Sequence, residues 1–580
     1  MPIVAQSSET TDWVSRFADE VIEESERRAP GKPVVVASGL SPSGPIHLGN
    51  LREVMTPHLV ADEIRRRGHT VRHLISWDDY DRYRKVPNGV AGIDDSWAEH
   101  IGKPLTSVPA PAGSAYPNWA EHFKAAMTEA LAELGVEYDG ISQTEQYTAG
   151  TYREQVLFAM KHRGDIDAIL DQYRTKKAPA KKQQGQKPVD EAEVEAAEGS
   201  GAAAEDDGSS TSGYYPYKPY CGQCEKDLTT VTAYDDTTTE LSYTCSACGF
   251  AETVLLSEFN RGKLVWKVDW PMRWAYEGVI FEPSGVDHSS PGSSFQVGGQ
   301  IVGIFGGKQP IGPMYAFVGI SGMAKMSSSK GGVPTASDAL QIMEPQLLRW
   351  LYARRRPNQS FKIAFDQEIQ RLYDEWDKLA GKVADGSALP ADAAAYSRAV
   401  GTAAGELRPT PRPMAYRTLA SVADITAGAE DQTLRILSEL DPENPLASLD
   451  EVRPRLDKAE TWINTQVPAE ERTVVRDEPD AELLKSLDDQ GRESLRLLLD
   501  GLEANWSLDG LTHLVYGVPK VQAGFPADAT AKELPAEIKV AQRTFFALLY
   551  HLLVGRDTGP RLPTLLLAVG QERVRKLLSA

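Results

Sequence analysis

The chain has 580 residues, of which 41% are hydrophobic, and this is enough for several compact domains with cores of their own. The formal net charge of −20 means that the surface as a whole does not suit nucleic acid, so a nucleic-acid partner would need a local basic patch. Residues 1–13 lack the apolar core of a secretion signal, and no apolar run approaches the roughly 20 residues that span a bilayer. We therefore expect a large cytoplasmic protein without a membrane segment.

The N-terminal region predicts a strand, a turn and a helix. Residues 33–38, Pro-Val-Val-Val-Ala-Ser, form an apolar run typical of a buried parallel strand. A Gly- and Pro-rich turn follows at 39–46, and a helix is expected from about Leu48 to Arg67. His47 would then lie at a helix N-terminus, where free N–H groups and the helix dipole favour phosphate oxygens. Gly49 has no side chain, so a nucleotide could lie against the backbone there.

A second candidate for nucleotide binding lies much further along the chain, at Lys325-Met326-Ser327-Ser328-Ser329-Lys330. Its lysines can neutralise charge on a triphosphate, and its three hydroxyls can donate hydrogen bonds to phosphate. Gly319, Gly322, Gly331 and Gly332 flank the segment and could act as hinges of a closing loop. Taken singly, His47 could be a surface histidine and this segment a flexible, solvated loop. Together, the two segments predict an ATP site.

The pair His47-Leu48-Gly49-Asn50 and Lys325 to Lys330 resembles the two nucleotide-binding motifs of class I aminoacyl-tRNA synthetases. In that chemistry an amino-acid carboxylate attacks the α-phosphate of ATP, and the protein supplies positioning and charge stabilisation. The chain departs from the general class pattern at two positions. Asn50 stands where many members have a second histidine, and Ser328 stands where many have a second lysine. Lys330 could substitute for the missing lysine.

All four cysteines of the chain fall in two Cys-x-x-Cys pairs, Cys221/Cys224 and Cys245/Cys248. This spacing is typical of a structural zinc site with four thiolate ligands, which leaves no open position for a water molecule. Gly222 and Gly249 would ease the two turns. Two disulfides or four idle thiols are the alternatives, and disulfides are disfavoured in a chain without a secretion signal.

A low-complexity stretch at 176–213 precedes the cysteines. A block of lysines is followed by a run of acidic residues, with Ala, Gly, Ser and Gln between them. Such a composition cannot bury enough apolar surface to order itself, so we expect a disordered insertion, with a solvated tether a better interpretation of the basic part than an RNA contact.

After the cysteines, residues 264–271 suggest a return to the sheet, so the nucleotide-binding domain would be split by an insertion. From about residue 345, apolar residues recur at helical spacing, which predicts an all-helical C-terminal domain. These stripes include Ile369, Leu372, Tyr373, Trp376 and Leu379, then Leu495, Leu498, Leu499 and Leu502, and the apolar pairs from Phe545 to Leu553.

Two basic clusters could meet RNA. The first is Arg349 with Arg354, Arg355 and Arg356, and the weaker second is Arg573, Arg575 and Lys576. Either could instead be a solvated helix face, which is the better interpretation of the second.

Several longer strings narrow the resemblance to class I lysyl-tRNA synthetases over most of the chain, apart from 176–213 and much of 385–540. They are Trp77 to Pro87, Ile101 to Leu105, Asn118 to Phe123, Trp266 to Tyr276 and Gly559 to Leu562. That family shares the Asn50 and Ser328 forms of the two motifs. The resemblance implies lysine attachment to the 2′-hydroxyl of the terminal adenosine of tRNA(Lys), with tRNA needed for activation of lysine.

The resemblance also implies an α/β fold with a Rossmann-type parallel-sheet catalytic domain, a zinc-binding insertion and an all-α C-terminal domain. We expect the first catalytic half at 1–155, an inserted acceptor-stem domain at 156–264, the second half at 265–345 and an α-helical anticodon-binding domain at 346–580. The partners would be ATP with Mg²⁺, lysine and tRNA(Lys), and the protein would be a monomer with structural Zn²⁺.

The site residues implied by the resemblance form three sets. The catalytic residues are His47, Asn50, Lys325, Ser327, Ser328 and Ser329, and Pro45, Gly49 and Met326 join His47, Asn50 and Lys325 in binding ATP. Gly39 and Ser41 match positions that contact the backbone end of lysine, and Trp266, His288 and Tyr315 match its side-chain pocket. An ammonium on a four-carbon stem suits an aromatic cage, although Trp266 and Tyr315 could also be ordinary core residues. The carboxylate that pairs with the ε-ammonium could be Asp79, Asp287 or Glu53.

Three other functions are compatible with parts of this pattern. Another class I synthetase, such as a glutamyl enzyme, should present Arg or Lys to its substrate's second carboxylate, and the aromatic set argues against it. A paralogue that binds RNA without aminoacylating would be favoured by loss of His47 or of the Ser-rich loop, and both are present. A nucleotidyltransferase of small metabolites would leave the cysteines and the long helical region unexplained.

Overall fold

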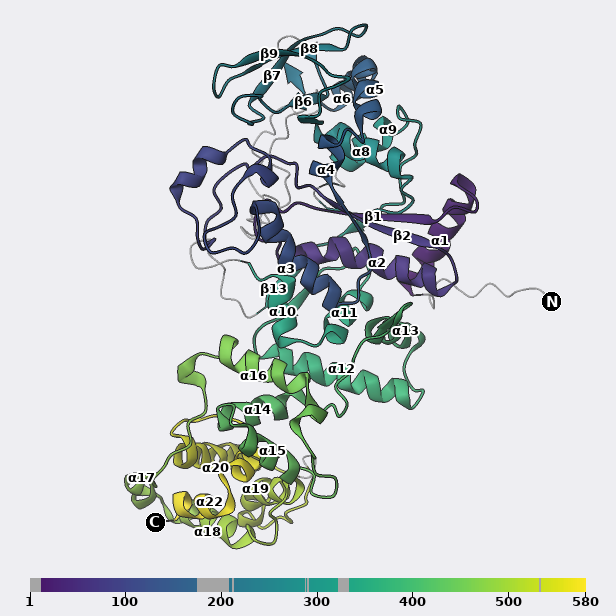
Figure 1. The fold of residues 1–580 in the computed structure, drawn as a ribbon. Helices are drawn as coiled ribbons and strands as arrows, with labels where there is room; N and C mark the ends of the chain where they lie inside the picture. The colour runs from purple at the N-terminus through teal and green to yellow at the C-terminus, as the bar shows by residue number, and fades with distance from the viewer. Residues whose placement is uncertain are drawn as a thin grey trace, which may run out of the picture. The chain divides into compact units, whose positions relative to one another are not determined.

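A computed structural model of the protein describes residues 12–174, 208–210, 213–286, 288, 292–321, 333–530 and 534–579. The chain divides into two compact units (Figure 1). The first holds Met1–Leu340, Pro345–Ile363 and Lys382–Leu407, and the second holds Gln341–Glu344, Ala364–Gly381 and Arg408–Ala580. The bounds of the two units differ from the domain boundary at residue 345 that the sequence suggests, because Pro345–Ile363 and Lys382–Leu407 belong to the first unit. Within the described ranges, no helix is both long and apolar enough to cross a bilayer.

A parallel sheet lies at the centre of the first unit. It contains β1 (Val34–Leu40), β2 (Val71–Trp77) and β3 (Asp139–Ser142), in that order. On the other side of β1, Val36 bridges Phe281 and Phe281 bridges Ile311, again in parallel. The sheet order therefore reverses between β1 and the Phe281 segment. Open α/β sheets bind ligands at the carboxyl ends of the strands beside such a reversal.

The predicted strand and helix of the N-terminal region are confirmed. The first four residues of β1 are buried, as expected for a strand covered on both faces. The helix begins with a short 3-10 turn, η1 (Leu48–Asn50), and continues as α2 (Leu51–Arg66). Helix α1 (Trp13–Arg28) packs beside α2 and is capped by the Asp12 side chain, which accepts from Val14 and Ser15 N–H groups (Figure 1).

The cysteine region forms an antiparallel sheet of β7 (Thr229–Tyr234), β8 (Glu240–Cys245) and β9 (Ala251–Leu255). The chain enters through β6 (Tyr217–Pro219) and leaves through β10 (Gly262–Leu264), which pairs with β6. Most of the stretch 176–213 lies outside the described residues. At its end, β4 (Ser209–Ser210) pairs with β5 (Gly213–Tyr214).

The predicted strand at 264–271 is wrong beyond Leu264, because helix α8 (Trp266–Glu277) begins directly after β10. The local alternation of apolar and polar residues resembles a strand. However, Trp266, Trp270 and Trp274 recur four residues apart and so share one helix face, against which apolar residues of β1 and β2 pack. The chain then returns to the sheet at Phe281.

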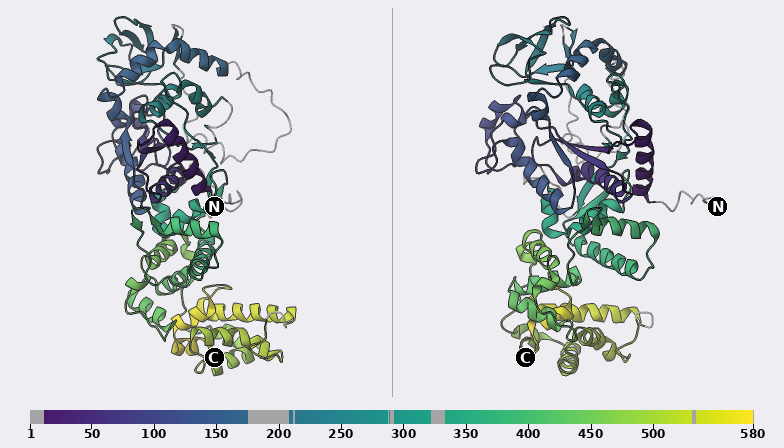
Figure 2. Two further views of the ribbon diagram at one scale, coloured as in Figure 1. Left: turned by 90° about the vertical axis from the view of Figure 1, so that its right-hand side faces the viewer. Right: turned by 45° about the vertical axis from the view of Figure 1, so that its right-hand side comes forward.

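The described residues of the second unit are largely helical, as Figure 2 shows from two further sides. Leu495, Leu498 and Leu502 pack in one apolar core with Phe545, Leu549, Leu552 and Leu553, so the predicted stripes are confirmed as core-facing. Its helices are α14 (Tyr416–Thr426), α15 (Glu430–Glu439), α16 (Arg455–Gln466), α17 (Ala481–Ser486), α18 (Asp489–Gly501), α19 (Leu508–Gln522), α20 (Ala536–Val554), α21 (Leu562–Val569) and α22 (Gln571–Leu578), with most of α12 (Glu368–Ala384).

The described residues also form three pairs of short strands and several further α-helices. The strand pairs are β11 (Ser284–Gly285) with β12 (Met314–Tyr315), β13 (Val318–Ser321) with β14 (Phe361–Ala364), and β15 (Gly401–Thr402) with β16 (Gly405–Glu406). The remaining helices are α3 (Trp119–Glu133), α4 (Gln143–Thr148), α5 (Arg153–Lys161), α6 (Arg163–Arg174), α9 (Ser294–Ile301), α10 (Ala336–Ile342), α11 (Pro345–Ala353) and α13 (Pro390–Val400).

Candidate active site

His47 lies between the carboxyl end of β1 and helix α2, directly before the 3-10 turn η1. Its ring covers Gly49, since a Cβ added at that glycine would lie 2.9 Å from ring atoms Cε1 and Nδ1. Any larger residue at position 49 would therefore displace the imidazole. Burial lowers the pKa of His47, so the neutral ring predominates at neutral pH. Asn50 follows at the N-cap of α2, while Pro45 is exposed in the preceding turn.

The second motif, from Lys325 to Lys330, lies outside the described residues, but the segments on either side of it meet the first motif. The Leu48 N–H donates to the Pro334 carbonyl at 2.7 Å, and His47 forms an antiparallel bridge with Thr335. On the other side, the Val318 carbonyl lies 3.8 Å from a Cβ built on Gly49. The fold thus brings both ends of the segment 322–332 to the turn that carries His47.

Glu53 connects two residues that the sequence places in the amino-acid pocket. It lies in the first turn of α2, where its Oε1 accepts from the Gly39 N–H at 3.4 Å and its Oε2 accepts from the Tyr315 hydroxyl. Tyr315 lies on β12, paired with Gly285 on β11. Ser41 is exposed in the turn after β1. A carboxylate, a tyrosine and the end of β1 therefore meet at the point where the sheet order reverses.

An aromatic wall, formed by Trp266, Trp270 and His288, lies on the adjacent helix and loop. The Trp266 and Trp270 rings stack with centroids 5.0 Å apart, and the His288 ring is 6.4 Å from Trp266 and 5.9 Å from Trp270. The Arg273 guanidinium carbon lies 5.3 Å from the centre of the Trp266 ring. Trp266 is thus half-buried and already has a cation over its indole, which leaves its remaining surface better suited to an apolar stem than to an ammonium.

The three carboxylates considered as partners of an ammonium differ in their surroundings. Asp79 is fully buried and accepts from Lys124 Nζ at 2.9 Å, the Ser142 hydroxyl at 2.7 Å and the Thr144 N–H at 2.8 Å. It is therefore engaged in holding the sheet edge. Asp287 lies outside the described residues. Glu53 contacts Gly39 and Tyr315, two residues that the sequence assigns to the amino-acid pocket.

Two charged residues of the pocket are not indicated by the sequence. Arg273 donates to Asp78 at 2.9 Å and pairs with Asp269 at 3.4 Å, and burial raises the pKa of Asp78 to about 6 although Arg273 opposes this. Glu282 accepts from the Trp270 and Trp274 indoles. A pocket is lined by Trp266, Trp270, Trp274, Arg273, Glu277 and Glu282 together with residues of β1 to β3. The Trp-x-x-x-Trp-x-x-x-Trp spacing could have indicated this wall.

Comparison with known proteins agrees with this geometry. Residues 11–405 match the family described as "tRNA synthetases class I (K)". The chain belongs to this family. It is 86% identical, over the full length of both chains, to the lysine–tRNA ligase of Streptomyces coelicolor. It is 33% identical to the lysine–tRNA ligase of Thermococcus kodakarensis and 31% identical to that of Treponema pallidum. Each alignment covers 98% of this chain, and 99% and 98% of the two relatives respectively.

In this class I synthetase, the four cysteines form a candidate metal site. Their Sγ atoms all lie within 4.8 Å of one another, and Cys221–Cys248 and Cys224–Cys245 are each 3.6 Å apart. Zn–S bonds of about 2.3 Å place tetrahedral sulfurs about 3.8 Å apart, so the cluster fits a zinc ion and excludes disulfides. Gly249 has φ +75°, as its turn requires, and a Cβ on Gly222 would lie 2.8 Å from the Glu252 carboxylate.

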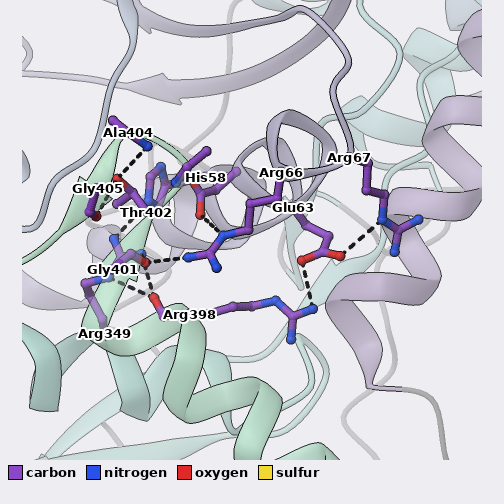
Figure 3. Close-up of polar contacts among 12 residues, drawn as sticks. His58, Glu63, Arg66, Arg67, Arg349, Arg398, Gly401, Thr402, Ala404 and Gly405 are labelled. Atoms are coloured by element: carbon purple, nitrogen blue, oxygen red, sulfur yellow. Dashed lines mark hydrogen bonds and ion pairs between the residues drawn. The ribbon is translucent and has the colours of Figure 1, made fainter.

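The prediction that Arg349 belongs to a basic surface patch is wrong, because its side chain is fully buried. Figure 3 shows Arg349 beside Arg398 and Gly401. It donates to the Leu134 carbonyl at 2.7 Å, to the Arg398 carbonyl at 2.7 Å and to the Gly401 carbonyl at 3.3 Å. It also lies 2.9 Å from Nε2 of His58. Arg349 therefore caps the C-termini of α3 and α13, which holds the segment 382–407 on the synthetase's first unit.

The other basic residues are nearer the surface. Arg354 lies over the Trp350 ring at 4.0 Å, and Arg356 is exposed. In the second unit, Arg573 pairs with Asp477 and Lys576 pairs with Glu478. These pairs agree with the interpretation of α22 as a solvated helix face.

Proposed function

We propose that this synthetase is a lysine–tRNA ligase. It activates lysine with ATP and Mg²⁺ to lysyl-adenylate and transfers the lysyl group to the 2′-hydroxyl of the terminal adenosine of tRNA(Lys). The observation that carries the proposal is the meeting of the His47 turn, the two ends of the segment 322–332 and the Glu53–Tyr315 pair at one edge of the sheet. The full-length relatives named lysine–tRNA ligase support the amino acid.

In the activation step, the chain supplies position and charge. Pro45, Gly49 and Met326 line the nucleotide, and His47 and Asn50 contact it at the start of α2. The neutral His47 ring donates one N–H to a phosphate oxygen whose charge grows in the transition state. Lys325 neutralises the departing pyrophosphate, and Ser327, Ser328 and Ser329 donate hydrogen bonds to it. Mg²⁺, bound with ATP, adds charge neutralisation on the phosphates.

We infer that Glu53 is the carboxylate that pairs with the ε-ammonium of lysine. It accepts from the Gly39 N–H and the Tyr315 hydroxyl, two residues that the resemblance assigns to the lysine pocket, and a carboxylate can accept several hydrogen bonds at once. Gly39 and Ser41 contact the backbone end of the substrate. Trp266 and His288 contact its carbon stem, because Arg273 already lies over the Trp266 ring.

The glutamyl alternative is disfavoured by the same contacts. A glutamate substrate needs a cation to meet its second carboxylate, and the cation of this pocket is Arg273. Arg273 is buried between Asp78 and Asp269, and these two carboxylates already use its charge.

The deciding experiment is aminoacylation of total tRNA with each amino acid in turn. Lysine is expected to be attached, and a preference for glutamate would overturn the proposal. Glu53→Gln keeps the shape of the side chain and removes its charge, so it should raise the KM for lysine while the KM for ATP changes little. Asp79→Asn is the matched control, since Asp79 binds Lys124 and should affect stability instead.

We propose that one Zn²⁺ is held by Cys221, Cys224, Cys245 and Cys248 and stabilises the insertion. Structural zinc is worth on the order of 10 kcal/mol in small domains, so its removal should unfold this sheet. Elemental analysis should find one zinc per chain, and four free thiols in a stable, metal-free protein would rule the site out.

The domain roles follow from the same proposal. Residues 1–155 and 265–345 form the catalytic domain, 156–264 contact the acceptor stem, and 346–580 contain the anticodon-binding domain. The protein acts as a monomer in the cytoplasm, where its tRNA is charged. Sedimentation at working concentrations tests the oligomeric state.

A further inference from the structure

Glu282 is a buried carboxylate directly behind the aromatic wall. It follows Phe281, the residue that continues the sheet beside β1, and its backbone N–H donates to the Ile311 carbonyl at 3.0 Å. Its side chain is 5% exposed. The position is therefore fixed by the sheet, and the carboxylate cannot turn toward bulk water.

Both oxygens of Glu282 accept from neutral indole groups. Trp270 Nε1 donates to Oε1 at 3.0 Å, and Trp274 Nε1 donates to Oε2 at 2.6 Å. An ionised carboxylate accepts at both oxygens, whereas a protonated one also needs an acceptor for its own proton, so this arrangement favours the charged form. Burial raises the pKa of Glu282, while the two indole N–H groups and the Arg273 charge oppose that shift.

The contact reaches the pocket through Trp270. Its ring stacks on Trp266 with an interplanar angle of 17°, and it lies edge-on to His288. Trp274 and Trp270 also pack on Phe295. Fixing the two indole nitrogens therefore fixes the wall that Trp266 presents to a ligand. Donation of an indole N–H to a carboxylate also increases the electron density of the ring, which strengthens its attraction for cations.

The charges that line the pocket are Arg273, Glu277 and Glu282. Arg273 is neutralised by Asp78 and Asp269, and Glu277 lies 3.7 Å from Arg72. Glu282, in contrast, is held by neutral donors. Its charge therefore acts from behind the wall, in addition to that of Glu53, on a ligand in the pocket, at a place where a low dielectric constant makes it effective.

We propose that Glu282 is a specificity-determining positioning residue: it fixes the tryptophan wall through Trp270 and Trp274 and selects a cationic amino-acid side chain over a neutral one of the same size. It does not touch the reacting atoms. The inference deepens the proposed function and rests on it, because it assumes that the pocket holds lysine.

The test compares lysine with 6-hydroxynorleucine, which has the same chain length but a hydroxyl in place of the ε-ammonium. The measured quantity is the ratio of the inhibition constant of 6-hydroxynorleucine to the KM for lysine during aminoacylation of tRNA. Glu282→Gln should lower this ratio about tenfold, with the KM for ATP changed less than about twofold. Glu282→Asp keeps the charge and should retain most of the ratio, even if both constants increase.

Glu24→Gln is the matched control. Glu24 is also a buried glutamate of the first unit, but it lies on α1 and pairs with Arg27 and Arg28 instead of lining the pocket. It should lower the melting temperature without changing the ratio. A Glu282→Gln variant that keeps the wild-type ratio, or that weakens lysine and 6-hydroxynorleucine equally, overturns the proposal.

Two further measurements cover the remaining outcomes. If Glu282→Gln does not fold because its amide N–H₂ meets an indole N–H, the double variant Glu282→Gln/Trp270→Phe removes that donor and is compared with Trp270→Phe alone. An unchanged ratio between these two proteins also overturns the proposal. If the wild type does not charge lysine, the proposed function fails, while calorimetric titration with lysine and 6-hydroxynorleucine still tests the selection of charge by Glu282.

Discussion

Arg349 and Glu282 are both buried, charged and held mainly by neutral groups, yet they occupy different kinds of place in the first unit. Arg349 donates to the carbonyl oxygens of two helix ends and to a histidine (Figure 3). Glu282 accepts from two indoles that form the wall of a pocket. Burial of a charge therefore does not by itself indicate function. The two residues differ in whether a ligand can come close enough to interact with the charge.

The largest expected effect is on stability and concerns Arg349. Arg349→Met should lower the free energy of unfolding by about 3–5 kcal/mol, because several buried carbonyl oxygens lose their donor. Urea unfolding of wild type and variant measures the loss. The folded fraction should keep the wild-type KM for lysine. A raised KM for lysine without a loss of stability would instead show that Arg349 acts on the lysine pocket, as Glu282 is proposed to do.

The next largest effect is on catalysis and concerns His47. His47→Ala removes one donor to the phosphates and should lower kcat about 10²–10³-fold, with a modest change in the KM for ATP. Gly49 lies under the ring, so the truncation leaves a small space and should cost little stability. Kinetics of aminoacylation together with a thermal melt make the measurement. Near-normal turnover would remove His47 from the catalytic residues.

Trp266 could be either a residue that binds lysine or an ordinary core residue. Trp266→Ala should raise the KM for lysine roughly 5–30-fold, as expected for about 1–2 kcal/mol of lost apolar contact with the carbon stem, and should leave the KM for ATP nearly unchanged. The paired KM values and a thermal melt decide the matter. Equal losses for both substrates, together with a large fall in melting temperature, would make Trp266 a core residue.

The smallest effect concerns His58, the histidine that faces Arg349. Burial, and then the charge of Arg349, hold the pKa of His58 well below its usual value. The unfolded chain takes up this proton near pH 6.5 and the folded chain does not, so the free energy of unfolding decreases as the pH falls below about 6.5, by at most about 1.4 kcal/mol per pH unit. The pKa of His73, lowered to about 3 by burial, acts in the same direction, whereas that of Asp78, raised to about 6, acts in the opposite direction below pH 6.

His58→Gln isolates the contribution of His58, because a glutamine oxygen can accept from Arg349 without titrating. Unfolding at pH 7.0 and pH 5.5 should show a loss on acidification that is about 1 kcal/mol smaller in the variant than in the wild type. The same pH dependence in both proteins would contradict the assigned burial of a neutral His58.

The sequence alone determined those features that depend on near neighbours or on spacing. The apolar run before the turn determined β1, the period of Leu495, Leu498 and Leu502 determined a core-facing helix, and the two Cys-x-x-Cys pairs determined the cysteine cluster. The same local rule failed at 265–271, where alternation suggested a strand and the four-residue spacing of three tryptophans determined α8.

Which of several similar side chains meet one another depends on the tertiary fold. The sequence presents Arg349 as one of several neighbouring arginines, and the carbonyls that bury it come from residues 134, 398 and 401. It presents Asp79 and Glu53 as equal candidates, until Lys124 and Ser142 engage one and Tyr315 meets the other. The physical reason is that the state of a charge depends on its solvation and its partners, and in a folded chain these come from residues far apart in the sequence.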